Sequence, residues 1–243
     1  MSASQNPRNS IKNQLLAALP PEEYERLLPY MELVSLDLKQ ILYAPNEPIQ
    51  YVYFLNSGVG SLLSLVESGD AVEVGTVGNE GMVGLPVFLG ANSIPGEAIQ
   101  QIPGEGMRMR ADVFQREVTP GSPLYKLLQL YTQALFNLIA QSSACNRLHS
   151  IEQRFCRWML MTRDRVGADQ FPLTQEFLAQ MLGVRRASVS EVATTIARAG
   201  FISYKYGKMT ILDTEGLEST SCECYVIVKR EFERLLGGNS AFS

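Results

Sequence analysis

The sequence has few of the residues that mark secreted, membrane-bound or metal-dependent proteins. Its 243 residues include one histidine and four cysteines, and no apolar run reaches the length of a membrane span. No charged segment followed by an apolar one stands at the start to suggest a secretion leader. The cysteines do not have the spacing of a disulfide framework. We therefore expect a globular, cytoplasmic protein that is long enough for two domains.

The cysteines and the histidine give little support for a metal site. The cysteines are Cys145, Cys156, Cys222 and Cys224. Cys222 and Cys224 form a Cys-x-Cys pair, but no further cysteine or histidine lies near them in the sequence to complete a zinc site. We predict structural thiols, with a redox role as the minor alternative, and no metal site. The only histidine, His149, is expected to be structural or solvent-exposed rather than a haem ligand, and any cofactor is unknown.

The net charge of −4 is unevenly distributed along the chain. Residues 1–146 contain 8 Lys/Arg against 14 Asp/Glu, a net −6, whereas residues 147–212 contain 10 against 5, a net +5. Residues 213–243 contain 3 against 6, a net −3. Binding of a nucleic acid depends on local positive charge rather than on the total. The segment 147–212 is therefore the candidate for phosphate binding.

The stretch from Phe171 to Leu212 has the pattern of two short helices followed by a hairpin. Thr174 has the chemistry of an N-cap, and apolar residues follow it at helical spacing. Gly183 permits a tight turn between the helices. Alternating apolar residues after the second helix predict a hairpin that turns near Gly207. This combination is typical of a DNA-binding winged helix-turn-helix.

The second helix of this stretch carries residue types that read DNA. Its first turn contains Arg185, Arg186 and Ser188, at the end that can enter the major groove. Arginine pairs with guanine through two hydrogen bonds, and hydroxyl groups bond to base edges or phosphates. Lys205 and Lys208 flank the turn of the wing. The alternative is an ordinary surface helix with solubilising arginines, and the adjoining wing favours DNA binding over it.

Upstream, from about Leu33 to Val113, short β-branched or aromatic runs alternate with glycine, proline and asparagine. This texture predicts an antiparallel β sandwich or jelly roll. The candidate strands are Gln40–Tyr43, Tyr51–Asn56, Gly60–Val66, Ala71–Val77, Ala98–Ile102 and Gly106–Ala111. Flanking helices are expected at Ile11–Leu19, Glu22–Tyr30, Ser150–Val166 and Tyr225–Leu236.

A long helix is predicted from about Ser122 to His149. Apolar residues recur along it in alternating steps of four and three, the pattern of a coiled-coil seam. A single seam could be buried against the β region of the same chain, but a second apolar face would let the helix pack on its own sheet and on a partner. We therefore predict a homodimer through this helix, which suits the reading of a palindromic site. The predicted dimerisation residues are Leu124, Leu128, Tyr131, Leu135 and Leu138.

In this order, a β-rich domain, a long helix and a winged helix-turn-helix resemble the Crp/Fnr family of bacterial transcription regulators. The resemblance extends from about Ile11 to Leu212, and its sharpest motifs are LTQEFLAQMLGVRRASVSEV, the wing AGFISYKYGKMTILD and GNEGMVG at Gly78–Gly84. It implies an α+β fold with three parts. These are an N-terminal antiparallel β jelly roll like a cyclic-nucleotide-binding domain (residues 1–120), a dimerisation helix (121–149) and a C-terminal winged helix-turn-helix domain (150–243).

The resemblance also implies roles for single residues of the DNA-binding part. Arg186 takes the place of a base-contacting arginine, and Thr174 and Gln175 would lie against the DNA backbone. Ala187 stands where relatives often carry a base-reading glutamate, and Glu191 where some carry arginine, so the operator should differ from the best-known one. The predicted DNA contacts are Thr174, Gln175, Arg185, Arg186, Ser188, Ser190, Glu191, Lys205 and Lys208.

The sensor part departs further from the family pattern. Cyclic-nucleotide binders carry a Gly-Glu pair for the ribose and an Arg-Ser pair for the phosphate, where this chain has Gly84-Leu85 and about Gly96-Glu97. Leucine cannot accept a bond from a ribose hydroxyl, and Glu97 would repel a phosphate. Ile139 falls where a polar residue would contact the base. The candidate effector pocket is Gly84, Leu85, Gly96, Glu97 and Ile139, with cAMP in its usual mode not expected.

The leading hypothesis is therefore a homodimeric, sequence-specific transcription regulator whose β domain senses an unidentified effector. Its expected partners are double-stranded DNA with a palindromic operator, a second copy of the chain and, by resemblance, RNA polymerase, with no membrane partner. The alternative is a constitutive DNA-binding regulator whose β domain is purely structural. A jelly roll could also be a cupin-like metal enzyme, but residues 1–146 contain no histidine. We thus predict no catalytic residues and no enzymatic activity.

Overall fold

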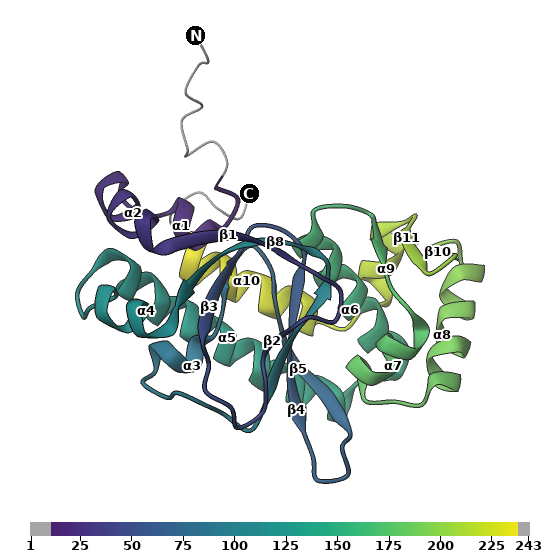
Figure 1. Cartoon of the computed structure of the whole chain (residues 1–243). Helices are drawn as coiled ribbons and strands as arrows, with labels where there is room; N and C mark the ends of the chain where they lie inside the picture. The colour runs from purple at the N-terminus through teal and green to yellow at the C-terminus, as the bar shows by residue number, and fades with distance from the viewer. Residues whose placement is uncertain (1–10, 238–243) are drawn as a thin grey trace.

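A β sandwich forms the N-terminal half of the structure, a computed structural model that describes residues 11–237 (Figure 1). Two four-stranded antiparallel sheets, with strand orders β1-β8-β3-β6 and β2-β7-β4-β5, make up the sandwich. Apolar side chains of both sheets contribute to its interior. The strands are β1 (Met31–Leu36), β2 (Ile41–Tyr43), β3 (Tyr51–Leu55), β4 (Val59–Leu65), β5 (Ala71–Val77), β6 (Met82–Val83), β7 (Glu97–Ile102) and β8 (Gly104–Arg110).

The predicted α+β fold with an antiparallel β region is confirmed, and each of the candidate strands overlaps an observed one. Two strands of the sandwich, β1 and β6, were not predicted. β1 is an edge strand in which only Leu36 is fully buried, so its sequence lacks a clear alternation. β6 has only two residues, and its pairing with β3 defines it. Neither feature leaves a pattern that sequence alone reveals.

Short helices lie at the same end of the sandwich (Figure 1), and the side chain of Asn13 caps the first of them and bonds it to the sandwich. It accepts a hydrogen bond from the backbone nitrogen of Leu16 and donates to the carbonyl oxygens of Leu55 and Gly81 at 2.9 and 2.8 Å. The N-terminal segment is thereby tied to β3 and to the glycine-rich turn before β6. These helices are α1 (Gln14–Ala17), α2 (Pro21–Leu27), η2 (Leu28–Tyr30), α3 (Leu85–Phe88) and α4 (Ala111–Glu117).

The long helix α5 (Pro123–Leu148) begins after the N-cap Ser122 and packs against the sandwich. The Tyr131 hydroxyl donates to the carbonyl oxygen of Met82 at 3.2 Å, and its ring lies where any side chain at Gly81 would clash. The residues of the predicted seam are all at most 4% exposed within a single chain. These residues are Leu124, Leu128, Tyr131, Leu135 and Leu138.

The assignment of these five side chains to a contact between chains was therefore wrong, because they are buried within a single chain. Leu135 and Leu138 lie beside Gly75 of β5. Helical periodicity identifies the apolar face of a helix but does not identify the surface that covers it. The exposed apolar side chains of α5 lie elsewhere on its circumference. Phe136 is 65% exposed and Leu148 is 75% exposed.

Helix α6 (Ile151–Val166) follows α5 after a sharp change of direction and opens with a capping box of Ser150 and Gln153. It lies between the sandwich and the helices of residues 175–220 (Figure 1). Trp158 Nε1 donates to Glu73 Oε1 on β5 at 2.9 Å. Arg165 forms an ion pair of 2.8 Å with Glu80, and both side chains are buried. These polar contacts join α6 to the sandwich.

A helix-turn-helix with a three-stranded sheet completes the C-terminal region. The predicted hairpin is present, and a third strand, β9, pairs with β11 on the side away from β10. The last helix, α10, runs back from this region and packs along α5 (Figure 1). No helix within residues 11–237 is long and apolar enough to cross a membrane. The elements are β9 (Gln170–Pro172), α7 (Gln175–Leu182), α8 (Arg186–Arg198), β10 (Ile202–Lys205), β11 (Lys208–Ile211), α9 (Thr214–Thr220) and α10 (Cys224–Leu236).

Candidate nucleic-acid interface and sensor cavity

The turn between α7 and α8 is fixed by local interactions at both of its sides. Thr174 caps α7 by accepting a hydrogen bond from the backbone nitrogen of Phe177 at 3.1 Å. Gly183 ends α7 with a φ of +62°, in the left-handed region that glycine adopts without strain. The buried guanidinium of Arg154 on α6 donates to the carbonyl oxygen of Leu182, which would otherwise be unpaired at the helix end. The angle between the two helices is thus set from within the chain.

Helix α8 buries one face and presents the other to solvent. Val189, Ala193 and Ile196 are buried beneath it. Arg185 at its N-cap and Arg186 at its first residue are exposed, and neither guanidinium has a hydrogen-bond or ion-pair partner within residues 11–237. Unpaired arginines at a helix N-terminus are free to bond to an external acceptor. The exposed face of α8 also contains Ala187, Glu191, Thr194 and Arg198.

The arginines of α6, in contrast, form hydrogen bonds or ion pairs with other groups of the protein. Besides Arg154 and Arg165, Arg157 is buried and donates to Ser142 Oγ at 3.1 Å. Arg163 forms an ion pair of 2.6 Å with Asp169. The basic excess of residues 147–212 is therefore only partly available to a nucleic acid. Its free portion is concentrated on α8 and on the wing.

The two helices are also joined by a polar contact at their solvent-facing edge. Ser190 Oγ on α8 lies 2.7 Å from Gln175 Oε1 in the first turn of α7 and donates to it. This bond orients the Gln175 amide and leaves its nitrogen as an available donor. Ser190 is therefore a positioning residue for Gln175. Ser188, two residues earlier on α8, is half-buried.

The wing ends in a tight turn with basic residues on both strands. Lys205 and Lys208 are paired across the hairpin and are both exposed. Tyr206, between them, is fully exposed and has a φ of +52°, and Gly207 follows with +73°. This type of turn carries two consecutive left-handed residues. The wing thus presents two ammonium groups beside a rigid hairpin tip.

The sandwich contains a cavity of about 300 Å³ between its strands and α5. Four of the five predicted effector residues, Gly84, Leu85, Gly96 and Ile139, line it, whereas Glu97 does not. The other lining side chains include Leu62, Val74, Met82, Leu89, Ile94 and Leu135. A cavity of this size is at the lower end of the range for small-molecule sites, and its lining is almost wholly apolar.

The carboxyl group of Glu73 is the main titratable group at the contact between the sandwich and α6. Ser61 Oγ donates to it at 2.7 Å, opposite the bond from Trp158. Burial raises the pKa of Glu73 to about 7, although both hydrogen bonds favour the ionised form. The contact therefore changes its charge near neutral pH.

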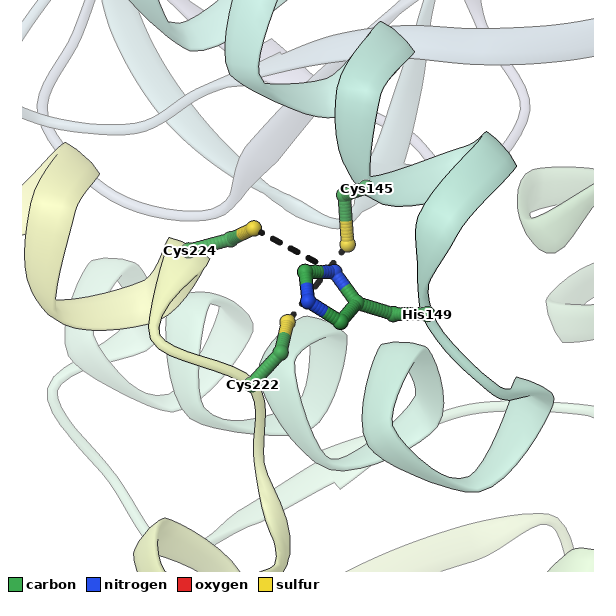
Figure 2. A group of neighbouring side chains, drawn as sticks. All are labelled: Cys145, His149, Cys222 and Cys224. Atoms are coloured by element: carbon green, nitrogen blue, oxygen red, sulfur yellow. Dashed lines mark hydrogen bonds between the residues drawn. The ribbon is translucent and has the colours of Figure 1, made fainter.

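A cluster of three cysteines and one histidine lies where α5 ends and α10 begins (Figure 2). Cys145 and His149 come from the end of α5, and Cys222 and Cys224 from the segment that enters α10. Their ligand atoms all lie within 4.8 Å of one another. The expectation that the Cys-x-Cys pair has no cysteine or histidine near it was wrong, because the fold brings together segments that are 75 and 77 residues apart.

The class of protein is indicated by four features in one chain. These are two helices at a tight turn, a three-stranded wing, a long helix and a β sandwich. Residues 153–220 match the model of the Crp-like helix-turn-helix domain, and 79–85% of the chain is covered by matches to the fold of solved Crp/Fnr regulators. None of the curated proteins matches the sequence.

Three solved structures illustrate the similarity. FixK2 from Bradyrhizobium japonicum has a TM-score of 0.67 and 14% identity over 79% of this chain and 98% of its own. The c-di-GMP-responsive global regulator CLP of Xanthomonas campestris has a TM-score of 0.65 and 14% identity over 80% and 100%. A CRP-family transcriptional regulator from Thermus thermophilus has a TM-score of 0.66 and 17% identity over 77% and 96%. At these identities the likeness establishes the fold.

Proposed function

We propose that this protein is a sequence-specific, DNA-binding transcription regulator of the Crp/Fnr type. The observation that carries the proposal is the exposed N-terminus of α8, where Arg185 and Arg186 have no partner within residues 11–237. An arginine that is unpaired in the free protein can form two hydrogen bonds with guanine without breaking an existing contact. Because α8 is held by the Gly183 turn and by Arg154, its tip is presented as a rigid unit.

The surrounding residues supply the phosphate contacts in this proposal. Thr174 and Gln175 at the start of α7 approach one DNA strand, and the Gln175 amide nitrogen, oriented by Ser190, donates to a phosphate. Lys205 and Lys208 on the wing neutralise a second stretch of backbone. Ser188 and Glu191 lie on or beside the groove-facing side of α8 and modulate which bases are accepted.

We further propose that the active form is a homodimer, with a contact different from the predicted seam. The exposed residues Phe136, Ala140 and Ala144 follow one another at steps of four along α5, and Leu148 continues the stripe. A contiguous exposed apolar stripe on a long helix, rather than any single exposed side chain, indicates a contact with another protein surface. A dimer through this stripe carries two copies of α8, as a palindromic operator requires. In this proposal residues 1–120 form the sensor, 121–149 the dimer helix and 150–243 the DNA-binding domain, although α10 returns to α5.

The cavity of the sandwich supports a sensor role over a purely structural one. Because its lining lacks charged side chains, a small apolar molecule rather than a cyclic nucleotide is the effector class that we propose. To test this effector class, a cell extract is separated into fractions by polarity. The affinity of the purified protein for its operator is then measured with and without each fraction. We expect a response to an apolar fraction that is lost in Ile139→Trp, which fills the cavity. If no fraction changes the affinity, the constitutive alternative holds.

The DNA-binding proposal is tested by selection from a library of random duplexes with the full-length protein. We expect a palindromic consensus whose half-sites are about 10 base pairs apart. The affinity for the consensus should exceed that for unrelated duplex at every salt concentration, because base contacts add to the phosphate term. Failure to enrich any sequence at any salt concentration would contradict the proposal. RNA polymerase as a partner, and a cytoplasmic location, are inferred from the same resemblance.

A further inference from the structure

The Cys/His cluster has the composition and the geometry of a mononuclear metal site. Cys145 Sγ lies 3.5 Å from Cys222 Sγ, and Cys224 Sγ lies 3.5 Å from His149 Nδ1. A tetrahedral zinc ion with Zn–S bonds of about 2.3 Å separates its ligand atoms by about 3.7 Å. The four side chains point toward one another from two segments of the chain (Figure 2). Three cysteines and one histidine are a common ligand set of structural zinc sites.

The position of the ligands in the chain suits such a site. Cys145 and His149 are four residues apart at the end of α5, and this spacing puts both on one face of a helix. Cys224 is the first residue of α10, so its thiol lies at the N-terminus of that helix. The three cysteines are at most 4% exposed and form a small cluster apart from the main apolar core. They are therefore not packed as ordinary core residues.

A second shell around the four ligands is already in place. The Nε2 atom of His149 lies 3.3 Å from Glu223 Oε2, whereas Nδ1 is the ring atom that lies near Cys224 Sγ. A carboxylate at this position holds the proton on Nε2 and leaves Nδ1 free as a metal ligand. Gln141 Nε2 donates to Cys224 Sγ at 3.1 Å, which stabilises a thiolate.

Two buried guanidinium groups supply independent support for a negatively charged site. Arg154 and Arg157 interact electrostatically with Cys145, and neither forms an ion pair within 4.0 Å of a carboxylate in residues 11–237, although Arg157 also interacts with the carboxyl group of Glu73. In that same range, Arg154 Nε and Arg157 Nη1 are buried without a hydrogen-bond partner. A buried cation is costly unless an opposite charge compensates it. Zinc with three thiolates and a neutral histidine carries a net charge of about −1 and offers that compensation.

We propose that Cys145, His149, Cys222 and Cys224 bind one zinc ion. The ion would tie the C-terminus of α5, where the chain turns into the DNA-binding region, to the start of α10. It would thereby hold α10 against α5 and fix the turn at His149. The close spacing of the ligand atoms suits a single ion rather than a multi-iron cluster, whose own atoms would occupy the space between the ligands.

The proposal is tested by the metal content of the full-length protein, purified under reducing conditions without chelator. We expect about one zinc ion per chain by plasma mass spectrometry, and its loss in Cys222→Ser. Cys156→Ala, which removes a buried cysteine outside the cluster, is the control and should retain the ion. Glu223→Gln should keep the ion but bind it about 10–100-fold more weakly in a chelator competition.

A second measurement covers the case in which Cys222→Ser does not fold. Wild-type protein reconstituted with Co²⁺ should show the visible and near-ultraviolet bands of a tetrahedral thiolate site, and Zn²⁺ should abolish them. The proposal would be overturned if wild-type protein supplied with an equimolar amount of zinc bound none. Its peptide map would then show either free thiols or a Cys145–Cys222 disulfide. Bound iron with sulfide would also overturn it. DNA takes no part in these measurements, so their outcome is independent of the proposed function.

Discussion

Trp158 Nε1 on α6 donates a 2.9 Å hydrogen bond to the carboxylate of Glu73 on β5. This bond joins the sandwich to helix α6, and Arg154 of α6 in turn holds the turn between α7 and α8. A change in the sandwich thus has a short mechanical route to the DNA-binding region. The route runs from β5 through α6 and Arg154 to the end of α7. Coupling between the sandwich and the DNA-binding region requires that the contact between them can adopt two different arrangements.

The first prediction concerns pH and Glu73. Because burial raises the pKa of Glu73 to about 7, the folded protein binds this proton more tightly than the unfolded chain. The free energy of unfolding should therefore fall as pH rises from about 4.5 to 7. Glu73→Gln removes this dependence and should be more stable than wild type at pH 8 by roughly 1–3 kcal/mol, with little difference at pH 5.

Urea unfolding of both proteins between pH 5 and 8 measures this effect. Glu67→Gln, an exposed carboxylate on the same hairpin, is the control and should leave the slope with pH unchanged. If the free energy of unfolding changed with pH by the same slope in wild type and in Glu73→Gln, a group other than Glu73 would be responsible for the pH dependence.

The second prediction separates the two faces of α5. Leu128 is fully buried in the core of its own chain, so Leu128→Ala should cost about 2–5 kcal/mol of stability. Phe136→Asp changes a side chain that is 65% exposed and should yield monomers with nearly unchanged thermal stability. Leu38→Asp, at a residue that is 51% exposed between β1 and β2, should stay dimeric. Analytical ultracentrifugation provides the measurement, and a dimeric Phe136→Asp would place the contact elsewhere.

The third prediction concerns the wing. Replacing Lys205 and Lys208 with alanine should weaken binding about equally for all duplexes, because these residues contact phosphates. Each substitution should reduce the slope of log affinity against log salt by about 1 per subunit, or about 2 for the proposed dimer. Titrations of one operator and one unrelated duplex at several salt concentrations provide the slopes. A loss confined to the operator would instead assign a lysine to base recognition.

The fourth prediction concerns the turn between α7 and α8. Gly183 has a φ of +62°, and a Cβ there would lie 3.0 Å from Val72 Cγ2 on β5. Gly183→Ala should therefore destabilise the protein by about 1–2 kcal/mol, since the left-handed conformation is strained for alanine. Gly167→Ala has a similar φ of +68° but no neighbour within 4 Å. Thermal unfolding measures the stability that each variant loses. A larger loss in Gly183→Ala than in Gly167→Ala reports the contact with β5, and equal losses would mean that backbone strain alone is responsible.

The elements of the winged helix-turn-helix were predictable because their signals are local. Thr174 caps the helix that follows it, and Gly183 ends that helix, as their positions in the sequence indicated. The length of α5 followed from its apolar spacing, which predicted a helix from about Ser122 to His149. Strand β9 was missed because three residues, of which only Phe171 is buried, give no recognisable alternation.

The contacts between distant segments were not predictable in the same way. The pattern of α5 was read correctly as an apolar face, but its coverage by the sandwich depends on the tertiary fold. The same holds for the α6 arginines, which contribute to the basic excess of residues 147–212 but bind groups of the protein such as the Leu182 carbonyl. The Cys-x-Cys pair acquired Cys145 and His149 only through the packing of α10 on α5.

The most direct test of DNA recognition by α8 is the effect of Arg186→Ala on a set of operators that each carry one changed base pair. The protein should lose about 1–3 kcal/mol of affinity for the consensus operator and tolerate all base pairs at one position of each half-site. Arg110→Ala, at a residue whose side chain is 67% exposed on the sandwich, should bind like wild type. A loss of equal size on every duplex, with the base preference intact, would contradict base recognition by Arg186.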